Sequence, residues 1–362
     1  MKKNDTFPIL PFQIRPDEVL HEVSEFNVKL FHGINTLSKI GDIEVGVSKK
    51  EAVFQEDKMV LYRFNPRVKK TNPVPVLIIY ALVNRPYMAD LQDGRSMIQG
   101  LLDTGLDVYL IDWGYPDSAD RYLTLDDYIN GYIDRCVDFI CRKSKQKKIN
   151  ILGICQGGTF SLCYTALHQE KVRNLITTVT PVDFHTKNDL LSNMVRNVDI
   201  DLLVDTLGNL PGELLNWTFL SLKPFRLLGQ KYMDLVNLLD NKEQARNFMR
   251  MEKWIFDSPD QAGEAFRQFT RQFYQENGLI KGTVNIGGRT IDLIDIEIPV
   301  LNIYAAADHL VPPDSSKALA GCIGSKDYSE LEFPGGHIGI YVSGKAQKMI
   351  PPSVGKWLAK RT

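Results

Sequence analysis

Several features are missing from this sequence, and each absence excludes a class of protein. The longest strongly apolar run, Val74–Val83, has ten residues, too few to cross a bilayer as a helix. Two lysines stand at the N-terminus without a long apolar run behind them, so we expect no secretory signal. The formal net charge is −1, which gives no general electrostatic reason to expect a nucleic-acid partner. These absences favour a cytoplasmic protein with no transmembrane segment.

The sequence contains few cysteines, and their spacing matches no common paired motif. The chain has five cysteines, an odd number, and no CxxC pair. An odd count without a secretory signal favours a reducing compartment over a disulfide framework, and the missing CxxC pair argues against a zinc site. No metal-binding cluster or dinucleotide fingerprint appears either, so we expect no cofactor.

What is present is the composition of an ordinary globular protein with a sizeable core. Of 362 residues, 44% are hydrophobic and 24% are charged. Short apolar runs, typical of strands buried on both faces, alternate with segments of helical periodicity. The expected strands are Val74–Val83, Asp107–Trp113, Lys148–Ile154, Val172–Val182, Pro299–Ala306 and Tyr328–Phe333. The expected helices are Leu125–Arg142, Gly157–His168 and Ser343–Ala359, although Pro351 and Pro352 constrain where the last one starts. This alternation predicts an α/β fold with a mostly parallel sheet flanked by helices.

The stretch 184–292 departs from this alternation of strands and helices. It is rich in Leu, Phe, Met and Trp at helical spacing. We interpret it as a helical cap insertion over the active site, since functional segments lie at the carboxyl ends of strands in open α/β sheets. The alternative is that it packs as more core. The expected division is an N-terminal segment 1–53, a catalytic core formed by 54–183 and 293–362, and the cap 184–292.

The strongest local signal is the run Gly153-Ile154-Cys155-Gln156-Gly157-Gly158, between an expected strand and an expected helix. This is the context of a nucleophile elbow, G-x-S-x-G, with cysteine in place of serine. The sharp turn needs small neighbours, and the helix N-terminus favours a thiolate. A lone cysteine is more often a small buried hydrophobe, which is our interpretation of Cys136, Cys141, Cys163 and Cys322.

Candidate partners for Cys155 follow in the chain order nucleophile, acid, histidine that α/β-hydrolases use. Asp308 lies just past one expected strand and His337 just past the next. The acid would fix the imidazole tautomer, and the imidazole would take the thiol proton. Asp308 could instead be a turn residue and His337 a loop histidine, and Asp112 and Asp183 are weaker candidates for the acid.

The oxyanion hole is expected to use two backbone N–H groups. One is that of Gln156, directly after the nucleophile. The other belongs to the loop Val83-Asn84-Arg85-Pro86-Tyr87. Pro86 has no N–H, so Val83 or Asn84 is the donor we expect.

Cysteine in this position favours acyl transfer over hydrolysis. A thiol accepts an acyl group from a thioester with little change in bond energy, and the enzyme thioester stays activated toward another acceptor. Two alternatives remain open. One is a cysteine-dependent hydrolase of the same fold, such as an acyl-CoA thioesterase or a polyester depolymerase. The other is a binding protein that kept the fold and lost its chemistry.

At these residues the chain resembles the polyhydroxyalkanoate synthases. Their G-x-C-x-G-G box is matched by Gly153 to Gly158, and the segments ADHLVPP, FPGGHIG, VNRPY and IDWG are similar to family segments. The resemblance runs from about Phe54 to the C-terminus. The chain looks like the short catalytic subunit of the two-subunit class III type, which needs a second, non-catalytic subunit.

The resemblance implies an acyltransferase mechanism. Cys155, activated by His337, would accept a 3-hydroxyacyl group, chiefly 3-hydroxybutyryl, and release coenzyme A. Asp308 would assist His337 or act on the 3-hydroxyl of the incoming unit. The polyester product forms granules, so the protein would divide between cytoplasm and granule surface, as a homodimer or hetero-oligomer. The apolar segment Ile200–Leu239 is a candidate for cap, dimer or granule contact, and the alternative is plain core.

Overall fold

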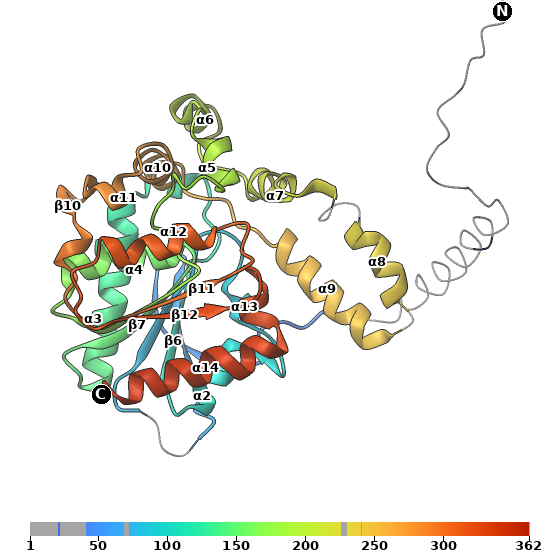
Figure 1. Ribbon diagram of the computed structural model, residues 1–362, viewed down its shortest axis with the longest axis horizontal. Coiled ribbons are helices and arrows are strands. Elements are labelled where there is room, and N and C mark those ends of the chain that lie inside the picture. The colour runs from blue at the N-terminus through green and yellow to red at the C-terminus, as the bar shows by residue number, and fades with distance from the viewer. Residues whose placement is uncertain (1–20, 22–40, 69–71, 226–229, 240, 362) are drawn as a thin grey trace, which may run out of the picture. The chain divides into compact units, whose positions relative to one another are not determined.

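A computed structural model describes residues 21, 41–68, 72–225, 230–239 and 241–361 (Figure 1). These residues form two compact units. The larger comprises 44–222 and the part from Lys253 onward, and the smaller comprises 223–252 together with the residues up to Ile43. The strands and the candidate site lie in the larger unit. The division into core and cap at 184–292 stays a prediction.

The larger unit is built on an eight-stranded sheet. Its order is β1-β2-β6-β3-β7-β8-β11-β12. The strands are β1 Lys50–Glu56, β2 Met59–Phe64, β3 Val76–Ile79, β6 Val108–Asp112, β7 Ile149–Ile154, β8 Val172–Thr178, β11 Val300–Ala305 and β12 Tyr328–Phe333. The two pairings that involve β2 are antiparallel, and all others are parallel. The α/β-hydrolase fold expected from the sequence is thereby confirmed.

All six expected strands are present; five of them are apolar runs that the sheet buries, whereas β12, at the sheet edge, alternates polar and apolar residues and buries only Phe333. Every residue of β3, β6, β7 and β11 is buried. The sequence interpretation missed β1 and β2. The strand β1 lies at the sheet edge and is mostly polar and exposed, so it lacks the apolar signal of the central strands.

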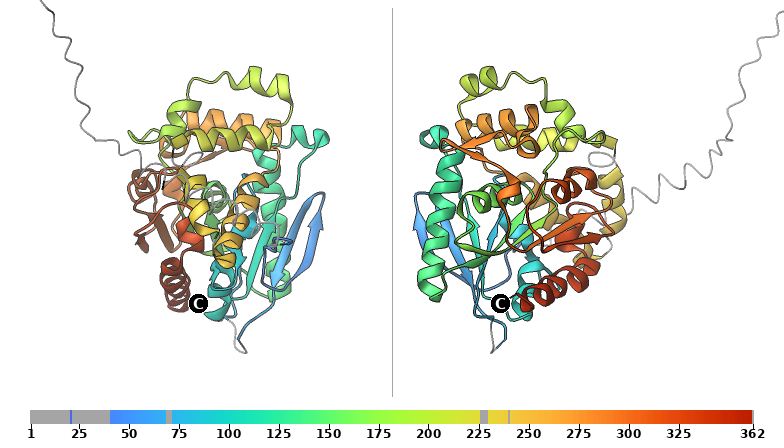
Figure 2. Two further views of the ribbon diagram at one scale, coloured as in Figure 1. Left: turned by 90° about the vertical axis from the view of Figure 1, so that its right-hand side faces the viewer. Right: turned by 60° about the vertical axis from the view of Figure 1, so that its left-hand side comes forward.

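Helices cover both faces of the sheet (Figures 1 and 2). On one face α2, Met97–Asp103, packs against α14, Gly344–Ala359. On the other face lie α3, Asp134–Ser144, and α4, Gln156–His168. A π-helix, η3 Asp127–Ile133, runs directly into α3. The prolines that we expected to limit the start of α14, Pro351 and Pro352, lie inside that helix.

The insertion expected at 184–292 is largely helical. Its helices are α5 Leu190–Val195, α6 Ile200–Leu207, α7 Gly212–Ser221, α8 Lys231–Leu238, α9 Lys242–Phe256, α10 Gly263–Phe269, the π-helix η5 Thr270–Gln275 and α11 Gly278–Lys281. A hairpin of β9, Val284–Ile286, and β10, Arg289–Ile291, follows. In the segment Ile200–Leu239 some apolar side chains are core, such as Val204, whereas Leu202 and Trp217 are 65% and 60% exposed. A contact role for this segment stays a prediction.

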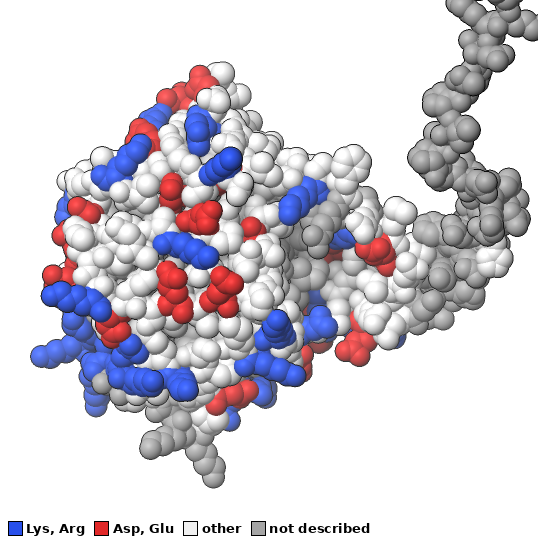
Figure 3. Space-filling view, viewed as in Figure 1, with Lys and Arg blue, Asp and Glu red and all other residues white. Residues whose placement is uncertain are grey.

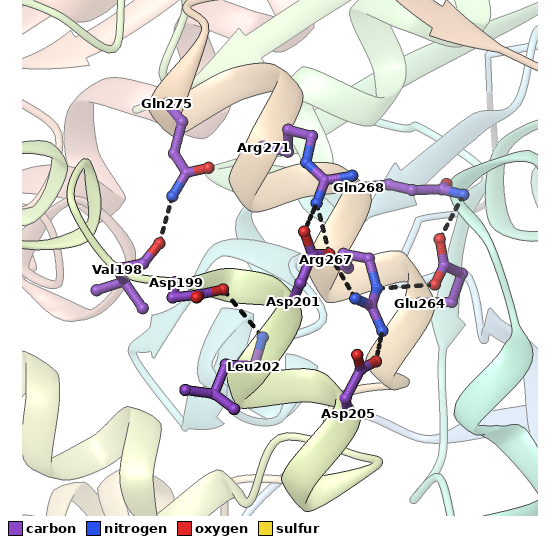
Figure 4. Close-up of polar contacts among 10 residues, drawn as sticks. All are labelled: Val198, Asp199, Asp201, Leu202, Asp205, Glu264, Arg267, Gln268, Arg271 and Gln275. Carbon is purple, nitrogen blue, oxygen red and sulfur yellow. Dashed lines mark hydrogen bonds and ion pairs between the residues drawn. The ribbon is translucent and has the colours of Figure 1, made fainter.

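Charged side chains join α6 to α10 and η5 (Figure 4). The Arg267 guanidinium contacts Asp201 at 2.5 Å, Asp205 at 2.6 Å and Glu264 at 3.1 Å. Arg271 contacts the Asp201 carboxylate at 2.5 Å. The side chain of Arg267 is 17% exposed, but those of Asp201 and Asp205 are 55% and 69% exposed, so solvent and salt screen these ion pairs. Elsewhere acidic and basic side chains are interspersed over much of the face in Figure 3.

Candidate active site

Cys155 occupies a strained turn between β7 and α4. Its backbone has φ 54° and ψ −124°, a conformation that a non-glycine residue adopts only at a cost of about 1–3 kcal/mol. Backbone hydrogen bonds hold the turn: the Cys155 N–H donates to Thr178 O at 2.9 Å, and Cys155 O accepts from Gly158 N at 2.9 Å. The expected elbow is therefore present in the backbone, with the cysteine at its apex.

The glycines after Cys155 are required by close packing. A Cβ atom on Gly157 would lie 2.2 Å from the carbonyl oxygen of Ile79, and one on Gly158 would lie 1.8 Å from Oγ1 of Thr180. Real Cβ atoms do not approach other atoms so closely, so α4 can start against β3 and the end of β8 only with glycine here.

Asp308 and His337 lie in the loops after β11 and β12, two neighbouring parallel strands. The distance from His337 Nδ1 to Asp308 Oδ2 is 2.7 Å, and both residues are buried. The other carboxylate oxygen, Oδ1, accepts from the backbone N–H groups of Leu310 at 2.9 Å and Val311 at 3.0 Å. Both oxygens of Asp308 are thus engaged, one by the loop and one by the imidazole.

The pKa of the His337 imidazole also depends on Cys155. Burial lowers the pKa of His337, but the Asp308 carboxylate and the Cys155 sulfur outweigh burial and raise this pKa to about 10. The structure therefore brings Cys155, Asp308 and His337 together. The alternative acids lie elsewhere: Asp112 pairs with Arg85 at 2.8 Å, and Asp183 accepts from Asn277 at 2.8 Å.

The remaining cysteines are in different surroundings. Cys136 and Cys163 are buried, while Cys141, Cys155 and Cys322 are partly exposed. Burial raises the pKa of Cys136, Cys141 and Cys163, and it raises that of Cys322 to about 11. Among the described cysteines, only Cys155 lies beside a histidine that is held by a carboxylate.

The loop after β3 lies next to the elbow. The Leu82 N–H donates to the side-chain Oε1 of Gln156 at 3.0 Å. The backbone N–H groups of Val83, Asn84 and Gln156 have no acceptor among the residues that the structure describes. This is the condition expected of oxyanion-hole donors, which must stay free for a substrate oxygen.

A further set of contacts ties this loop to Trp254, near the C-terminal end of α9, and to Asp257, which directly follows α9. Asp257 accepts hydrogen bonds from the hydroxyls of Tyr87 at 3.0 Å and Tyr115 at 2.6 Å. Indole Nε1 of Trp254 donates to Arg85 O at 2.8 Å. We call these contacts the Asp257 latch. Two of these contacts, those of Tyr87 and Arg85, hold the loop that carries Val83.

The sequence interpretation missed three tyrosines around Cys155. Burial raises the pKa of Tyr80, Tyr274 and Tyr341 strongly, and the charge on Cys155 raises each further. Tyr80 directly follows β3, Tyr274 lies in η5 and Tyr341 lies in α13, Gly339–Val342. Only Tyr341 had a sequence signal, its position four residues after His337.

Comparison with known proteins decides the family. A sequence profile described as the alpha/beta hydrolase fold matches residues 74–343. The poly(3-hydroxyalkanoate) polymerase subunit PhaC of Allochromatium vinosum is 63% identical over 355 residues, which are 98% of this chain and 100% of the relative. The chain belongs to the poly(3-hydroxyalkanoate) polymerase subunit PhaC family. The family resemblance noted in the sequence is thereby confirmed.

Other members of this family are more distant. The subunit of the same name from Synechocystis sp. is 54% identical, with 98% of this chain and 96% of the relative covered. That of Cupriavidus necator is 27% identical, and the match spans 87% of this chain but only 56% of the relative. Among solved structures, the monoacylglycerol lipase of Paleococcus ferrophilus has a TM-score of 0.54 at 18% identity, over 83% of this chain and 99% of the lipase, a likeness of fold alone.

Two features are absent from the residues that the structure describes. No group of three or more His, Cys, Asp or Glu side chains within the described ranges could hold a metal ion. No helix in the part of the chain that the structure describes is long and apolar enough to cross a membrane.

Proposed function

We propose that this chain polymerises 3-hydroxyacyl groups, taken from coenzyme A, into a polyester through a covalent intermediate on Cys155. Membership in the polymerase subunit family supports the reaction class. The observation that carries the residue assignment is the cysteine at a strained elbow, beside an imidazole that a buried carboxylate holds at 2.7 Å. No cofactor is needed, because coenzyme A arrives and leaves with the substrate.

The first half-reaction acylates the enzyme. The Cys155 proton moves to Nε2 of His337, and the sulfur attacks the thioester carbonyl carbon. Negative charge on the carbonyl oxygen is met by the backbone N–H groups of Gln156 and Val83. The bond to the sulfur of coenzyme A then breaks, and this thiolate takes the proton from His337.

The second half-reaction extends the chain. Nε2 of His337 accepts the proton of a 3-hydroxyl group, whose oxygen attacks the acyl carbonyl carbon of the Cys155 thioester. The bond between that carbon and the Cys155 sulfur breaks as the ester bond forms, and the Cys155 thiolate takes the proton back from His337. We assign Asp308 to His337 rather than to the substrate hydroxyl, because Oδ2 is taken by the imidazole and Oδ1 by two loop N–H groups. Asp308 holds Nδ1 protonated, which leaves Nε2 as the proton acceptor.

The assembly is part of the proposal. The match to the longer Cupriavidus necator relative spans 56% of that protein, whereas the match to the Allochromatium vinosum subunit spans all of it. The identity of 63% to the Allochromatium vinosum subunit supports placing this chain beside that relative, and the proposal adds the two-subunit class III type, with a second, non-catalytic subunit, 3-hydroxybutyryl-CoA as the main substrate, and a place at the surface of cytoplasmic polyester granules.

The test supplies 3-hydroxybutyryl-CoA to the full chain, alone and with its partner subunit. We expect release of coenzyme A, recovery of the acyl groups as insoluble polymer, and an acyl adduct on Cys155 by peptide mass spectrometry. Cys155→Ala should abolish all three while the fold is retained. The matched control is Cys322→Ala, a partly exposed thiol that donates to Ala318 O, which should leave turnover unchanged.

The outcomes separate the candidate functions. Free 3-hydroxybutyrate in place of polymer would move the assignment to a cysteine-dependent hydrolase, the thioesterase or depolymerase alternative. Polymer made at full rate by Cys155→Ala would remove this cysteine from the mechanism. If neither coenzyme A release nor an acyl adduct on Cys155 is seen in the presence of the partner subunit, a binding protein is the candidate function that remains.

A further inference from the structure

The loop after β3 turns at Asn84 in a left-handed conformation. The backbone of Asn84 has φ 57°, which asparagine adopts more readily than most other non-glycine residues do. The residue before it is Val83, whose N–H group is the proposed second donor of the oxyanion hole. Before Val83 stands Leu82, whose N–H donates to Oε1 of Gln156 in the elbow at 3.0 Å. The direction of the Val83 N–H therefore depends on how Leu82 and Asn84 are held.

The side chain of Asn84 binds the C-terminal end of α9. Its Nδ2 donates to the carbonyl oxygens of Trp254 at 3.3 Å and Ile255 at 3.2 Å. Both carbonyls lie in the last turn of this helix, where C=O groups have no partner within the helix. A further bond runs in the opposite direction, since Nε1 of Trp254 donates to Arg85 O at 2.8 Å. Two neighbouring residues of the loop are thus bound to one helix end.

The neighbouring strand β6 holds the same loop at Arg85. The Arg85 guanidinium donates to the carboxylate of Asp112 at 2.8 Å and to Gly114 O at 2.9 Å. Within the described ranges, the amide NH₂ of Asn84 donates to no acceptor other than the two α9 carbonyls. Loss of this amide therefore leaves the loop anchored at Arg85 and frees the turn at Asn84.

Oxyanion-hole donors accelerate a reaction only when they are already aimed at the oxygen that becomes charged. We propose that Asn84 is a positioning residue: by binding the last turn of α9, its side chain holds the N–H of Val83 in place for the oxygen of the acyl group. The inference rests on the proposed function, in which Val83 and Gln156 stabilise that oxygen. Because α9 belongs to the insertion 184–292, a helix of this insertion then helps to set the geometry of the site.

Two variants remove the contact in different ways. Asn84→Gly deletes the amide and keeps a residue that adopts positive φ without strain. Asn84→Asp keeps the size of the side chain and replaces its donor group with a carboxylate oxygen. Lys145→Gly, a change at another left-handed position, the C-cap of α3, is the matched control.

The full chain with its partner subunit is tested in two reactions of Cys155. One is acylation by 3-hydroxybutyryl-CoA, followed in single turnovers over a range of substrate concentrations. The other is alkylation by iodoacetamide, read by peptide mass spectrometry. Acyl transfer places negative charge on a carbonyl oxygen, whereas alkylation displaces iodide from a saturated carbon and forms no oxyanion. Only the first reaction therefore depends on the oxyanion hole.

We expect acylation in both Asn84 variants to slow by about 10–100-fold, since outright removal of an oxyanion-hole donor costs about 10²–10³-fold. The loss should appear in the rate constant at saturation, with the half-saturating substrate concentration unchanged, because the hydrogen bond matters in the transition state. Alkylation of Cys155 should proceed at the wild-type rate in both variants. Both reactions of Lys145→Gly should match the wild type.

Several results would overturn the inference. Acylation at the wild-type rate would mean that the contact with α9 does not position the donor. A parallel loss of acylation and alkylation, or failure of both variants to fold, would give Asn84 a structural role only. A higher half-saturating concentration at an unchanged saturating rate would place Asn84 in substrate binding instead. A failure of the proposed function looks different, because the wild-type chain itself would then form no acyl adduct on Cys155.

Discussion

Replacing Asp308 with asparagine removes the negative charge of the side chain and keeps its shape. The amide of Asp308→Asn can keep its oxygen toward the N–H groups of Leu310 and Val311, which now bind Oδ1 at 2.9 and 3.0 Å. Its NH₂ group then faces Nδ1 of His337 and donates to it. The imidazole is forced into the tautomer with the proton on Nε2, which cannot take the proton of Cys155.

The magnitude follows from the pKa of His337. Asp308 and Cys155 raise this pKa from 6.5 to about 10 against the opposing effect of burial. At about 1.4 kcal/mol per pH unit the rise corresponds to about 5 kcal/mol, an upper bound for Asp308 because Cys155 shares in it. A raised pKa stabilises the fold below the unfolded pKa, and the stabilisation is lost as the pH rises through the folded value. The contribution is therefore complete below about pH 6.5 and lost by about pH 10.

The assay is urea unfolding of the wild-type chain and Asp308→Asn at several pH values between these limits. We expect the variant to be less stable by about 2–5 kcal/mol near neutral pH. The two curves should converge toward about pH 10, because the wild-type contribution is gone there. Acylation of Cys155 should fall by about 10³–10⁴-fold. Two unfolding curves that stay parallel across this range would refute the electrostatic reasoning.

Three further changes test other parts of the structure. Gly158→Ala places a Cβ atom 1.8 Å from Thr180 Oγ1 and should lower the free energy of unfolding in urea by about 1–3 kcal/mol. Gly321→Ala, whose Cβ would meet no atom within 4 Å, is the control and should lower it little. Equal losses in the two variants would contradict the packing argument. Asp257→Asn removes the charge of the Asp257 latch and should lower the free energy of unfolding by about 1–2 kcal/mol and slow the release of coenzyme A. Unchanged values would mean that the latch contributes neither to stability nor to turnover. Arg267→Gln should cost about 1 kcal/mol at low salt and less in concentrated salt, and a loss independent of salt would point to packing rather than charge.

The fold was predictable where burial controls the sequence. The strands β3, β6, β7 and β11 are apolar because helices cover both faces, and that constraint is visible in the residues themselves. The edge strand β1 has polar, exposed residues and pairs only with β2, so its position depends on a neighbour that no local pattern reveals. The π-helix η3 was likewise expected as ordinary helix, because a shift in backbone hydrogen bonding leaves the apolar periodicity of the segment intact.

The site was predictable where chemistry imposes a local motif. The elbow needs glycines at fixed spacing, and Asp308 and His337 follow strands whose ends meet at one edge of the sheet, so the candidate residues Cys155, Asp308 and His337 could be chosen from the sequence; their catalytic roles stay a proposal. Tyr80, Tyr274 and the Asp257 latch come from segments far apart in the chain. Tyrosines are common core residues, so no pattern in the sequence connects Tyr80 or Tyr274 with Cys155.

The burial of the other thiols has a practical consequence for measuring this enzyme. The raised pKa values of Cys136, Cys141, Cys163 and Cys322 keep their thiolate fractions small at neutral pH. A limiting amount of a thiol-directed fluorescent probe should therefore mark Cys155 first, so the other four cysteines need not be replaced. Counting marked molecules would give the fraction of chains in a preparation with a reactive Cys155, so that turnover could be expressed per reactive centre rather than per chain.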